Sequence, residues 1–271
     1  MDYRKLINGI KRFGSSEDDI CLHGYNITKE QINDNVIIAP CWEPNMLPGL
    51  GEVKNVNSDY LIKVWNIKHD DFDITYIKTE IGSPMFLEGL LPLGITSCKC
   101  IIFIGSVGSM DSNIGIGDIV IPEFSVCGDG TSRYLASDDL SYDVFGDKVF
   151  PDNSLQSILL NETSRICDEN KVCWHIGKNF SVDTISAQYA HIDTILNFDC
   201  NTIEMETAVA FRAAKLMNIP LVALFSVSDN TITNKSLISG RTQEEMEYRK
   251  FTRRELFPKI ILSTFKQATI S

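Results

Sequence analysis

Three short stretches contain residues whose types and spacing could support chemistry on a small molecule. The range 105–108, Gly-Ser-Val-Gly, follows an apolar run, and its glycines would let the backbone turn sharply and approach a ligand. The carboxylates of Glu204 and Glu206 lie two residues apart, and one carboxylate can accept hydrogen bonds from two hydroxyl groups. Asp229 ends another apolar run, where burial could raise its pKa enough for proton donation near neutral pH. These residue types suit a site that binds hydroxyl groups and transfers a proton.

Each candidate also has an ordinary structural interpretation. A glutamate such as Glu206 at a helix start commonly caps or pairs on that helix, and Met205 could be a core methionine. Asp229 follows Ser228, and such pairs often form turns or helix N-caps. The position of Asp229 at a strand end favours the catalytic interpretation.

Strands and helices alternate along the chain, which predicts a largely parallel sheet between helix layers. The range 105–108 is predicted as a turn after its strand, and 128–152 as surface loops, whereas 174–185 is predicted as strand and loop. Buried strands are predicted at 36–39, 100–105, 116–122 and 221–227, a hairpin at 61–67 and 73–78, and helices at 85–93, 154–170, 205–217 and 242–265, the last kinked at Pro258.

Length and composition indicate one globular domain. The chain has 271 residues with 44% hydrophobic and 23% charged, and we predict an N-terminal appendage at 1–34 before a single domain at 35–271. A net charge of −11 argues against nucleic acid and against anionic membranes as partners. The eight cysteines are scattered, which suggests reduced thiols, and the chain shows no leader-like apolar stretch, so we expect a cytoplasmic protein with no metal or cofactor.

In order, spacing and context, three stretches resemble the nucleoside phosphorylase superfamily over about residues 35–265. They are 102–109 with 116–121 following, then 203–208, and then 222–229. The resemblance implies an α/β fold, a single-domain three-layer sandwich with a mixed, partly barrel-like central sheet flanked by helices. It also implies a homo-oligomer that cleaves the N-glycosidic bond of a nucleoside, with a purine nucleoside preferred.

The resemblance assigns a role to each candidate. Glu206 would accept hydrogen bonds from the ribose hydroxyls, while Asp229 would donate toward N7 of the purine with Arg241 assisting it. An exposed arginine at the start of a helix is an equally good interpretation of Arg241. Further substrate-binding positions would be Met205 under the ribose, Glu204 beside it, Ser106 and Gly105 at phosphate or ribose, Phe180 and Val182 at the base, Glu43 at an attacking water, and His23 reaching a neighbouring subunit. Phe180 and Val182 could instead be core residues, and a solvent-exposed histidine is the more common interpretation of His23.

The acceptor is the least determined part of the prediction. Phosphorolytic relatives hold phosphate with arginines, but the matching places here contain Asn45, Phe103 and Asn57, which cannot replace a guanidinium. The sequence therefore favours water over phosphate by a small margin, although Lys54 or Arg133 could enter from loops. Phosphorolysis to ribose 1-phosphate and a catalytically inactive nucleoside sensor remain the alternatives, and the sequence leaves the base, the 5′ substituent and the oligomer size open.

Overall fold

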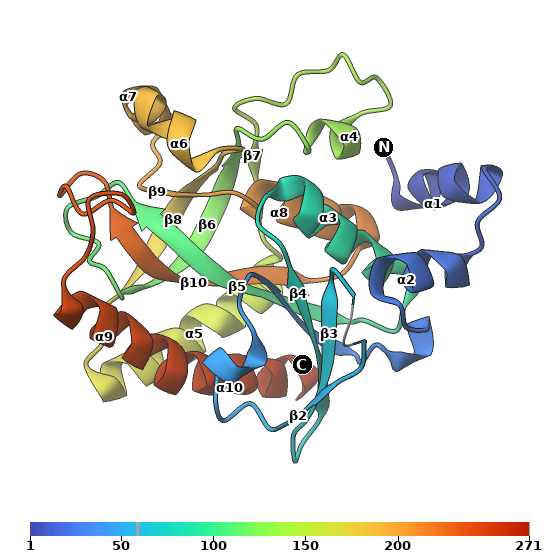
Figure 1. The fold of residues 1–271 in the computed structure, drawn as a ribbon, viewed down its shortest axis with the longest axis horizontal. Helices are drawn as coiled ribbons and strands as arrows, with labels where there is room; N and C mark the ends of the chain where they lie inside the picture. Colours follow the sequence, from blue (N-terminus) through green and yellow to red (C-terminus); the bar gives the residue numbers. More distant parts are fainter. Residues whose placement is uncertain (58–59, 271) are drawn as a thin grey trace.

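The computed structural model describes residues 1–57 and 60–270, and its centre is one mixed sheet (Figure 1). The main strand order is β10-β6-β8-β9-β5-β1-β4-β3-β2, with β7 paired to β6. The strands are β1 Asn35–Pro40, β2 Glu52–Asn55, β3 Lys63–Lys68, β4 Asp73–Thr79, β5 Cys100–Ser109, β6 Ile119–Cys127, β7 Lys148–Val149, β8 Trp174–Ser181, β9 Thr202–Glu204 and β10 Leu221–Asn230.

Helices cover both faces of this sheet. In Figure 1, α5, α9 and α10 lie below it, and α3 and α8 lie above it. None of the described helices has the length and apolarity needed to cross a membrane. The helices are α1 Tyr3–Arg12, α2 Glu17–Tyr25, α3 Ser83–Leu90, α4 Arg133–Ala136, α5 Asn153–Asn170, α6 Ile185–Gln188, α7 Ile192–Leu196, α8 Thr207–Met217, α9 Gln243–Phe251 and α10 Phe257–Ile270, with a π-helical turn at Thr252–Leu256.

One half of the sheet closes on itself. β5 pairs with β10 in parallel, β10 with β6, β6 with β8, β8 with β9, and β9 returns to β5. This ring of five strands makes the sheet a partial barrel, and the remaining strands extend from it through β1. The predicted fold class, a helix-flanked α/β sandwich with a mixed and partly barrel-like sheet, is confirmed.

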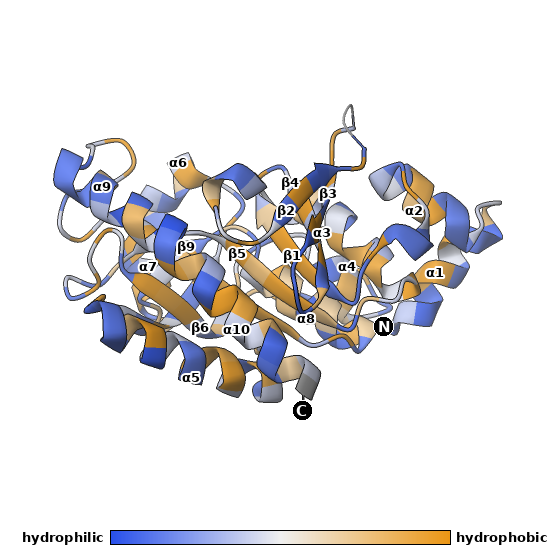
Figure 2. Ribbon diagram, turned by 90° about the horizontal axis from the view of Figure 1, so that it is seen from below, coloured by the Kyte–Doolittle hydropathy of each residue, from blue (hydrophilic) through white to orange (hydrophobic). Residues whose placement is uncertain are grey.

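Alternating residues of the central strands face two separate cores, because successive side chains on a strand point to opposite faces. On β10, Ala223 and Phe225 pack with α3 and α8, whereas Val222 and Leu224 pack with α5 and α10. In Figure 2 the central strands are mostly hydrophobic and the outer helices carry both hydrophobic and hydrophilic turns. Two-sided burial explains why these strands are continuous apolar runs in the sequence.

The range 105–108 is strand rather than turn, so that prediction was wrong. β5 continues to Ser109, and neither Gly105 nor Gly108 has a positive φ. Pairing with β10 on one side and β9 on the other holds these residues extended despite the low strand propensity of glycine.

Three further segments differ from prediction. β2 is a fully exposed strand that the sequence pattern did not indicate. The range 128–152 contains α4 and β7 between its loops. The final helix is interrupted at 252–256 by a π-helical turn that ends just before Pro258, a residue that cannot donate a backbone hydrogen bond.

Candidate active site

The carboxyl ends of β5 and β10 and the junction of β9 with α8 enclose a cavity of about 260 Å³. Neighbouring parallel strands end at the same edge of a sheet, so residues distant in sequence meet there. Two larger hollows, of about 680 and 900 Å³, have none of the predicted site residues among the described residues that line them. The smaller cavity is lined by Trp42, Phe103, Gly105, Ser106, Glu204, Met205, Glu206, Asp229, Leu237, Arg241 and Arg249, among others.

Gly108 is a position where a larger residue would crowd the acid of the cavity. It lies opposite Asp229 in the β5–β10 register, at an irregularity in β10. A Cβ at this position would come within 3.1 Å of Ile203 Cγ2 and 3.3 Å of Asp229 Oδ2. A Cβ on Gly105 would make only ordinary contacts at 3.6 Å. The glycine at 108 therefore leaves room for the Asp229 carboxyl.

Glu204 is a supporting carboxylate with its acceptor capacity filled. Its oxygens accept hydrogen bonds from Asn179 Nδ2 at 2.7 Å and Ser181 Oγ at 2.6 Å. They also accept from the backbone N–H groups of Glu206 at 2.6 Å and Thr207 at 2.8 Å. Burial raises the pKa of Glu204 while these donors lower it. Because it satisfies N–H groups at the start of α8, Glu204 performs the capping that the sequence allowed for Glu206.

Glu206 lines the cavity with a less occupied carboxyl. It is 6% exposed, and its Oε1 accepts one hydrogen bond, from Gly82 N at 2.6 Å. It occupies the N-cap position of α8 but makes no side-chain cap bond. Burial and the negative charge of Glu204 raise the pKa of Glu206 to about 8. A ligand that donates hydrogen bonds or carries positive charge would favour its ionised form.

Asp229 is the second buried acid of the cavity. It is 3% exposed, and its Oδ1 accepts a hydrogen bond from Ser228 Oγ at 2.5 Å. Burial raises the pKa of Asp229, and the Ser228 hydroxyl and the charges of Arg241 and Arg249 oppose that rise. The carboxyl is consequently placed to hold a proton and to give it to a bound ligand.

Arg241 reaches the cavity from the loop after β10. Its Nη1 donates to the backbone oxygen of Ser228 at 3.0 Å, next to the acid it was predicted to assist. Met205 also lines the cavity, and its backbone oxygen accepts from Ser83 Oγ at 2.6 Å. Arg241 lines the cavity, so its interpretation as an exposed arginine at the start of a helix does not apply.

Arg249 is a site residue that the sequence analysis missed. It lies near the end of α9, and its Nη2 donates to Ser106 Oγ at 2.6 Å across the cavity wall. The local sequence contains one hint, a second arginine four residues later at Arg253. Like charges at this spacing destabilise a helix, so their presence suggests that one of them has another role. Nothing in the short motif around Arg249 distinguishes it from exposed helix cations.

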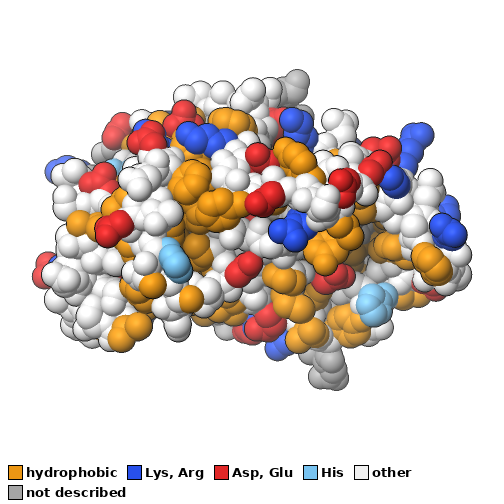
Figure 3. Space-filling model, turned by 90° about the horizontal axis from the view of Figure 1, so that it is seen from above, with side chains coloured by type: hydrophobic (Ala, Val, Ile, Leu, Met, Phe, Trp, Pro, Cys, Tyr) orange, Lys and Arg blue, Asp and Glu red, His pale blue; other side chains and the backbone are white. Residues whose placement is uncertain are grey.

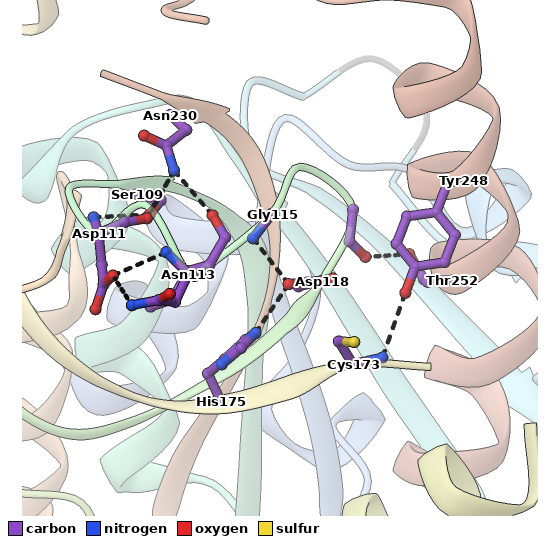
Figure 4. A network of polar contacts seen from close by, with 12 residues as sticks. Ser109, Asp111, Asn113, Gly115, Asp118, Cys173, His175, Asn230, Tyr248 and Thr252 are labelled. Carbon is purple, nitrogen blue, oxygen red and sulfur yellow. Dashed lines mark hydrogen bonds and ion pairs between the residues drawn. The ribbon is translucent and has the colours of Figure 1, made fainter. Parts of the chain in front are cut away.

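A polar network behind the cavity fixes the two segments that hold Asp229 and Arg249 (Figure 4). Asn230 Nδ2 donates to Ser109 Oγ, to Asp111 O at 2.7 Å and to Ile114 O at 2.9 Å. In the same view, Thr252 Oγ1 donates to a backbone oxygen and Tyr248 OH accepts from a backbone N–H. The end of β10 and Thr252, just after α9, are thus attached to the loop between β5 and β6, and Tyr248 of α9 is attached to Cys173 just before β8.

Four predicted residues lie outside this cavity within the protomer. Glu43 forms an ion pair with Lys78 at 3.5 Å, and His23 is exposed on α2. Phe180 and Val182 belong to a separate apolar cluster, where Phe180 packs on Phe145 and Phe198.

Three positions match the phosphate-binding arginines of relatives, and the residues found there are either packed in the core or exposed to solvent. Phe103 packs against Phe86 and Phe225, and the Asn57 side chain bonds backbone groups of Tyr25, Ile62 and Val64. Asn45 is exposed, as is Lys54. The described residues contain no group of three His, Cys, Asp or Glu side chains that could hold a metal ion.

The phosphorylase superfamily model matches residues 55–255 of the chain. A guanosine phosphorylase of Halorubrum lacusprofundi is 23% identical over 177 residues, covering 65% of this chain and 68% of that protein. An uncharacterized protein of Acanthamoeba polyphaga mimivirus is 32% identical over 159 residues, and a DeoD-type purine nucleoside phosphorylase of Lacticaseibacillus casei is 20% identical over 145. These alignments cover 56% and 54% of this chain, and 55% and 57% of those two relatives.

Solved structures share the fold at low sequence identity. A uridine phosphorylase of Vibrio fischeri has a TM-score of 0.72 at 18% identity, covering 92% of this chain and 95% of that one. A purine nucleoside phosphorylase of Toxoplasma gondii, in complex with immucillin-H, has a TM-score of 0.71 at 16% identity, covering 89% and 94%.

Proposed function

The chain belongs to the phosphorylase superfamily, and from this membership and its cavity we propose that it cleaves the bond between base and ribose of a purine nucleoside. The observation that carries the proposal is the pair of buried carboxyls, Glu206 and Asp229, that line one cavity with raised pKa values. Cleavage builds positive charge on the ribose and negative charge on the leaving base. A site for it therefore needs an acceptor at the sugar and a proton donor at the base.

Glu206 is the proposed ribose acceptor. A single bond to Gly82 leaves acceptor capacity on its carboxyl for the 2′ and 3′ hydroxyls. As the sugar becomes cationic, the ionised form of Glu206 stabilises it, and low solvent exposure strengthens that interaction. Met205 beside it would pack under the sugar.

Asp229 is the proposed proton donor to the base. A protonated carboxyl needs an acceptor nitrogen on the leaving base, which N7 of a purine supplies, whereas the ring nitrogens of uridine offer no such acceptor. Burial favours the protonated state of Asp229, and Arg241 holds the adjacent backbone oxygen in place. These roles are the reason for preferring purine nucleosides.

For the acceptor we propose phosphate rather than water. The expectation of hydrolysis rested on missing guanidinium groups, but Arg241 and Arg249 both line the cavity. Glu43, the residue assigned to an attacking water, is instead paired with Lys78 and is not among the described residues that line the cavity. Two cations in the wall suit an anionic acceptor better than a neutral one.

Base release tests the proposed function directly. Guanosine, inosine, adenosine and uridine would each be incubated with the protein, with and without millimolar phosphate, and products separated by chromatography. We expect free purine base and ribose 1-phosphate only when phosphate is present, with uridine much slower. Equal rates without phosphate would make the protein a hydrolase, and nucleoside binding without any base release would make it a sensor.

We further propose that the chain assembles as a homo-oligomer. The segment from α4 to the start of α5 exposes large apolar side chains. Figure 3 shows one face of the molecule, on which groups of hydrophobic side chains are exposed. Light scattering at micromolar protein should give a dimer or larger, and a monomer would remove His23 as a residue shared between subunits. The exposed residues are Tyr134, Leu140, Tyr142, Phe145 and Phe150.

A further inference from the structure

The cavity contains a cation whose partner is a neutral group. Arg249 is partly buried, and its Nη2 donates to the hydroxyl of Ser106 at 2.6 Å rather than to a carboxylate. Its Nε is buried without a hydrogen-bond partner among the described residues. A buried guanidinium with spare donors is unfavourable unless an anion completes it. The contact with Ser106 therefore leaves the guanidinium of Arg249 without an anionic partner.

The charged groups around Arg249 also favour a bound anion. Burial and the positive charges of Arg253 and Arg241 lower the pKa of Arg249 to about 10. At neutral pH the group stays protonated, and it is repelled by Arg241, which also lines the cavity, and by Arg253, which lies outside the lining, while Asp229 attracts it. An anion bound beside Arg249 would relieve the repulsion.

The backbone around Arg249 is fixed on both sides, so its guanidinium is held in place rather than free to move away. Tyr248 OH accepts a hydrogen bond from Cys173 N at 3.3 Å, and Thr252 Oγ1 donates to Gly117 O at 2.9 Å (Figure 4). The guanidinium carbon lies 5.9 Å from the centre of the Trp42 ring. Such a preorganised cation costs little further ordering when a ligand binds.

From this geometry we propose that Arg249 and Ser106 form a subsite for a phosphate group. The planar fork of arginine matches phosphate oxygens, and the Ser106 hydroxyl, which now accepts from Arg249, could turn its own proton toward them. The guanidinium comes from α9, whereas Phe103 and Asn45 offer none from β5 and the loop after β1. This subsite rests on the proposed function for its place in the reaction.

In that reaction the bound anion is free hydrogen phosphate. One phosphate oxygen bonds to C1′ of the ribose as the C1′–N bond breaks and its electron pair stays with the base. Asp229 gives its proton to the base, and the proton lost from hydrogen phosphate restores it. The same subsite chemistry would also fit a phosphate carried at the 5′ position of a nucleotide, so the test must separate these two sources.

The test compares Arg249→Ala and Arg249→Lys with Lys250→Ala, an exposed lysine one residue away on the same helix. Calorimetry would measure binding of inorganic phosphate and, separately, of guanosine 5′-monophosphate. We expect Arg249→Ala to weaken phosphate binding about 10- to 100-fold, as loss of a charge-assisted hydrogen bond does, with a smaller loss for Arg249→Lys and none for Lys250→Ala. Circular dichroism would establish that the variants are folded, and the lysine variant serves if the alanine variant is not.

The outcomes distinguish the subsite from the proposed function. Loss of affinity for inorganic phosphate identifies the acceptor, and loss confined to the monophosphate identifies a phosphorylated substrate; both support the subsite. Unchanged affinity of both Arg249 variants for both ligands would overturn it. If the wild-type protein cleaves no nucleoside yet binds phosphate through Arg249, the subsite stands and the proposed function fails.

Discussion

Replacing Glu206 with glutamine should make the protein more stable while it removes activity. Burial and Glu204 raise the pKa of Glu206 from 4.5 to about 8. Between these values the folded protein keeps a proton that the unfolded chain has released, so wild-type stability falls as pH rises. A glutamine carries no such penalty because it does not ionise.

The size of the effect follows from the pKa difference. At about 1.4 kcal/mol per pKa unit, the ionisable carboxyl lowers the free energy of unfolding by about 3 kcal/mol at pH 7 and by about 5 kcal/mol above pH 8. At pH 5.5 the penalty is only about 1 kcal/mol. Urea unfolding of wild type and Glu206→Gln at pH 5.5, 7 and 8.5, at one protein concentration, should show a gap that widens with pH.

Glu204→Gln is the matched control, since it removes the same charge two residues away. Its carboxylate accepts four hydrogen bonds, and an amide NH₂ would face donors instead of accepting from them. We expect this variant to lose about 1–3 kcal/mol of stability. A destabilised Glu206→Gln, or a gap that does not change with pH, would refute the assignment of the raised pKa to Glu206.

Three further predictions concern the acid and the elements that place it. Asp229→Asn should lower the turnover number for base release far more than it weakens nucleoside binding, because the proton is needed mainly in the transition state; steady-state kinetics and calorimetry check this, and wild-type turnover would contradict it. Asn230→Ala removes a side chain with four hydrogen bonds behind Asp229, and it should cost about 2 kcal/mol in urea unfolding and reduce turnover more than it changes KM; unaltered turnover would separate Asn230 from the positioning of Asp229. Gly108→Ala brings a methyl group to 3.3 Å from Asp229 Oδ2 and should lower turnover with about 1 kcal/mol or less lost in stability, whereas a fully active variant would show that this close approach is unimportant.

The buried strands were predictable because they are apolar on both faces. The runs that became β1, β5 and β10 face helices on either side, and such burial produces continuous hydrophobic sequence. β2 was not predictable in this way, since all four of its residues are exposed and it forms only by pairing with β3. The glycine stretch of β5 is strand for a similar reason, because its partners and not its own propensity hold it extended.

The candidate site was predictable where its residues come from strand ends. Ser106, Glu206 and Asp229 were expected together, and they line one cavity, as Arg241 does. Phe180 was assigned from its segment alone, but the direction of a side chain decides what it contacts, and Phe180 points into an aromatic cluster. Arg249 could not be found from local sequence because only the packing of α9 across β5 brings it to Ser106.

The charges of the cavity give a physical reason to expect an anionic acceptor. With Asp229 protonated for the proposed proton transfer and both Glu204 and Glu206 ionised around a bound ribose, Arg241 and Arg249 balance the two carboxylates and leave the occupied wall with no net charge. A water molecule would add no charge to this wall, whereas hydrogen phosphate, with about two negative charges near neutral pH, can be held by the two guanidinium groups and brings negative charge beside a sugar that is becoming cationic. The anion then stabilises the transition state more than the ground state, which is the condition for faster bond cleavage. Moving the guanidinium from β5 to α9 preserves this balance even though Phe103 contributes only packing.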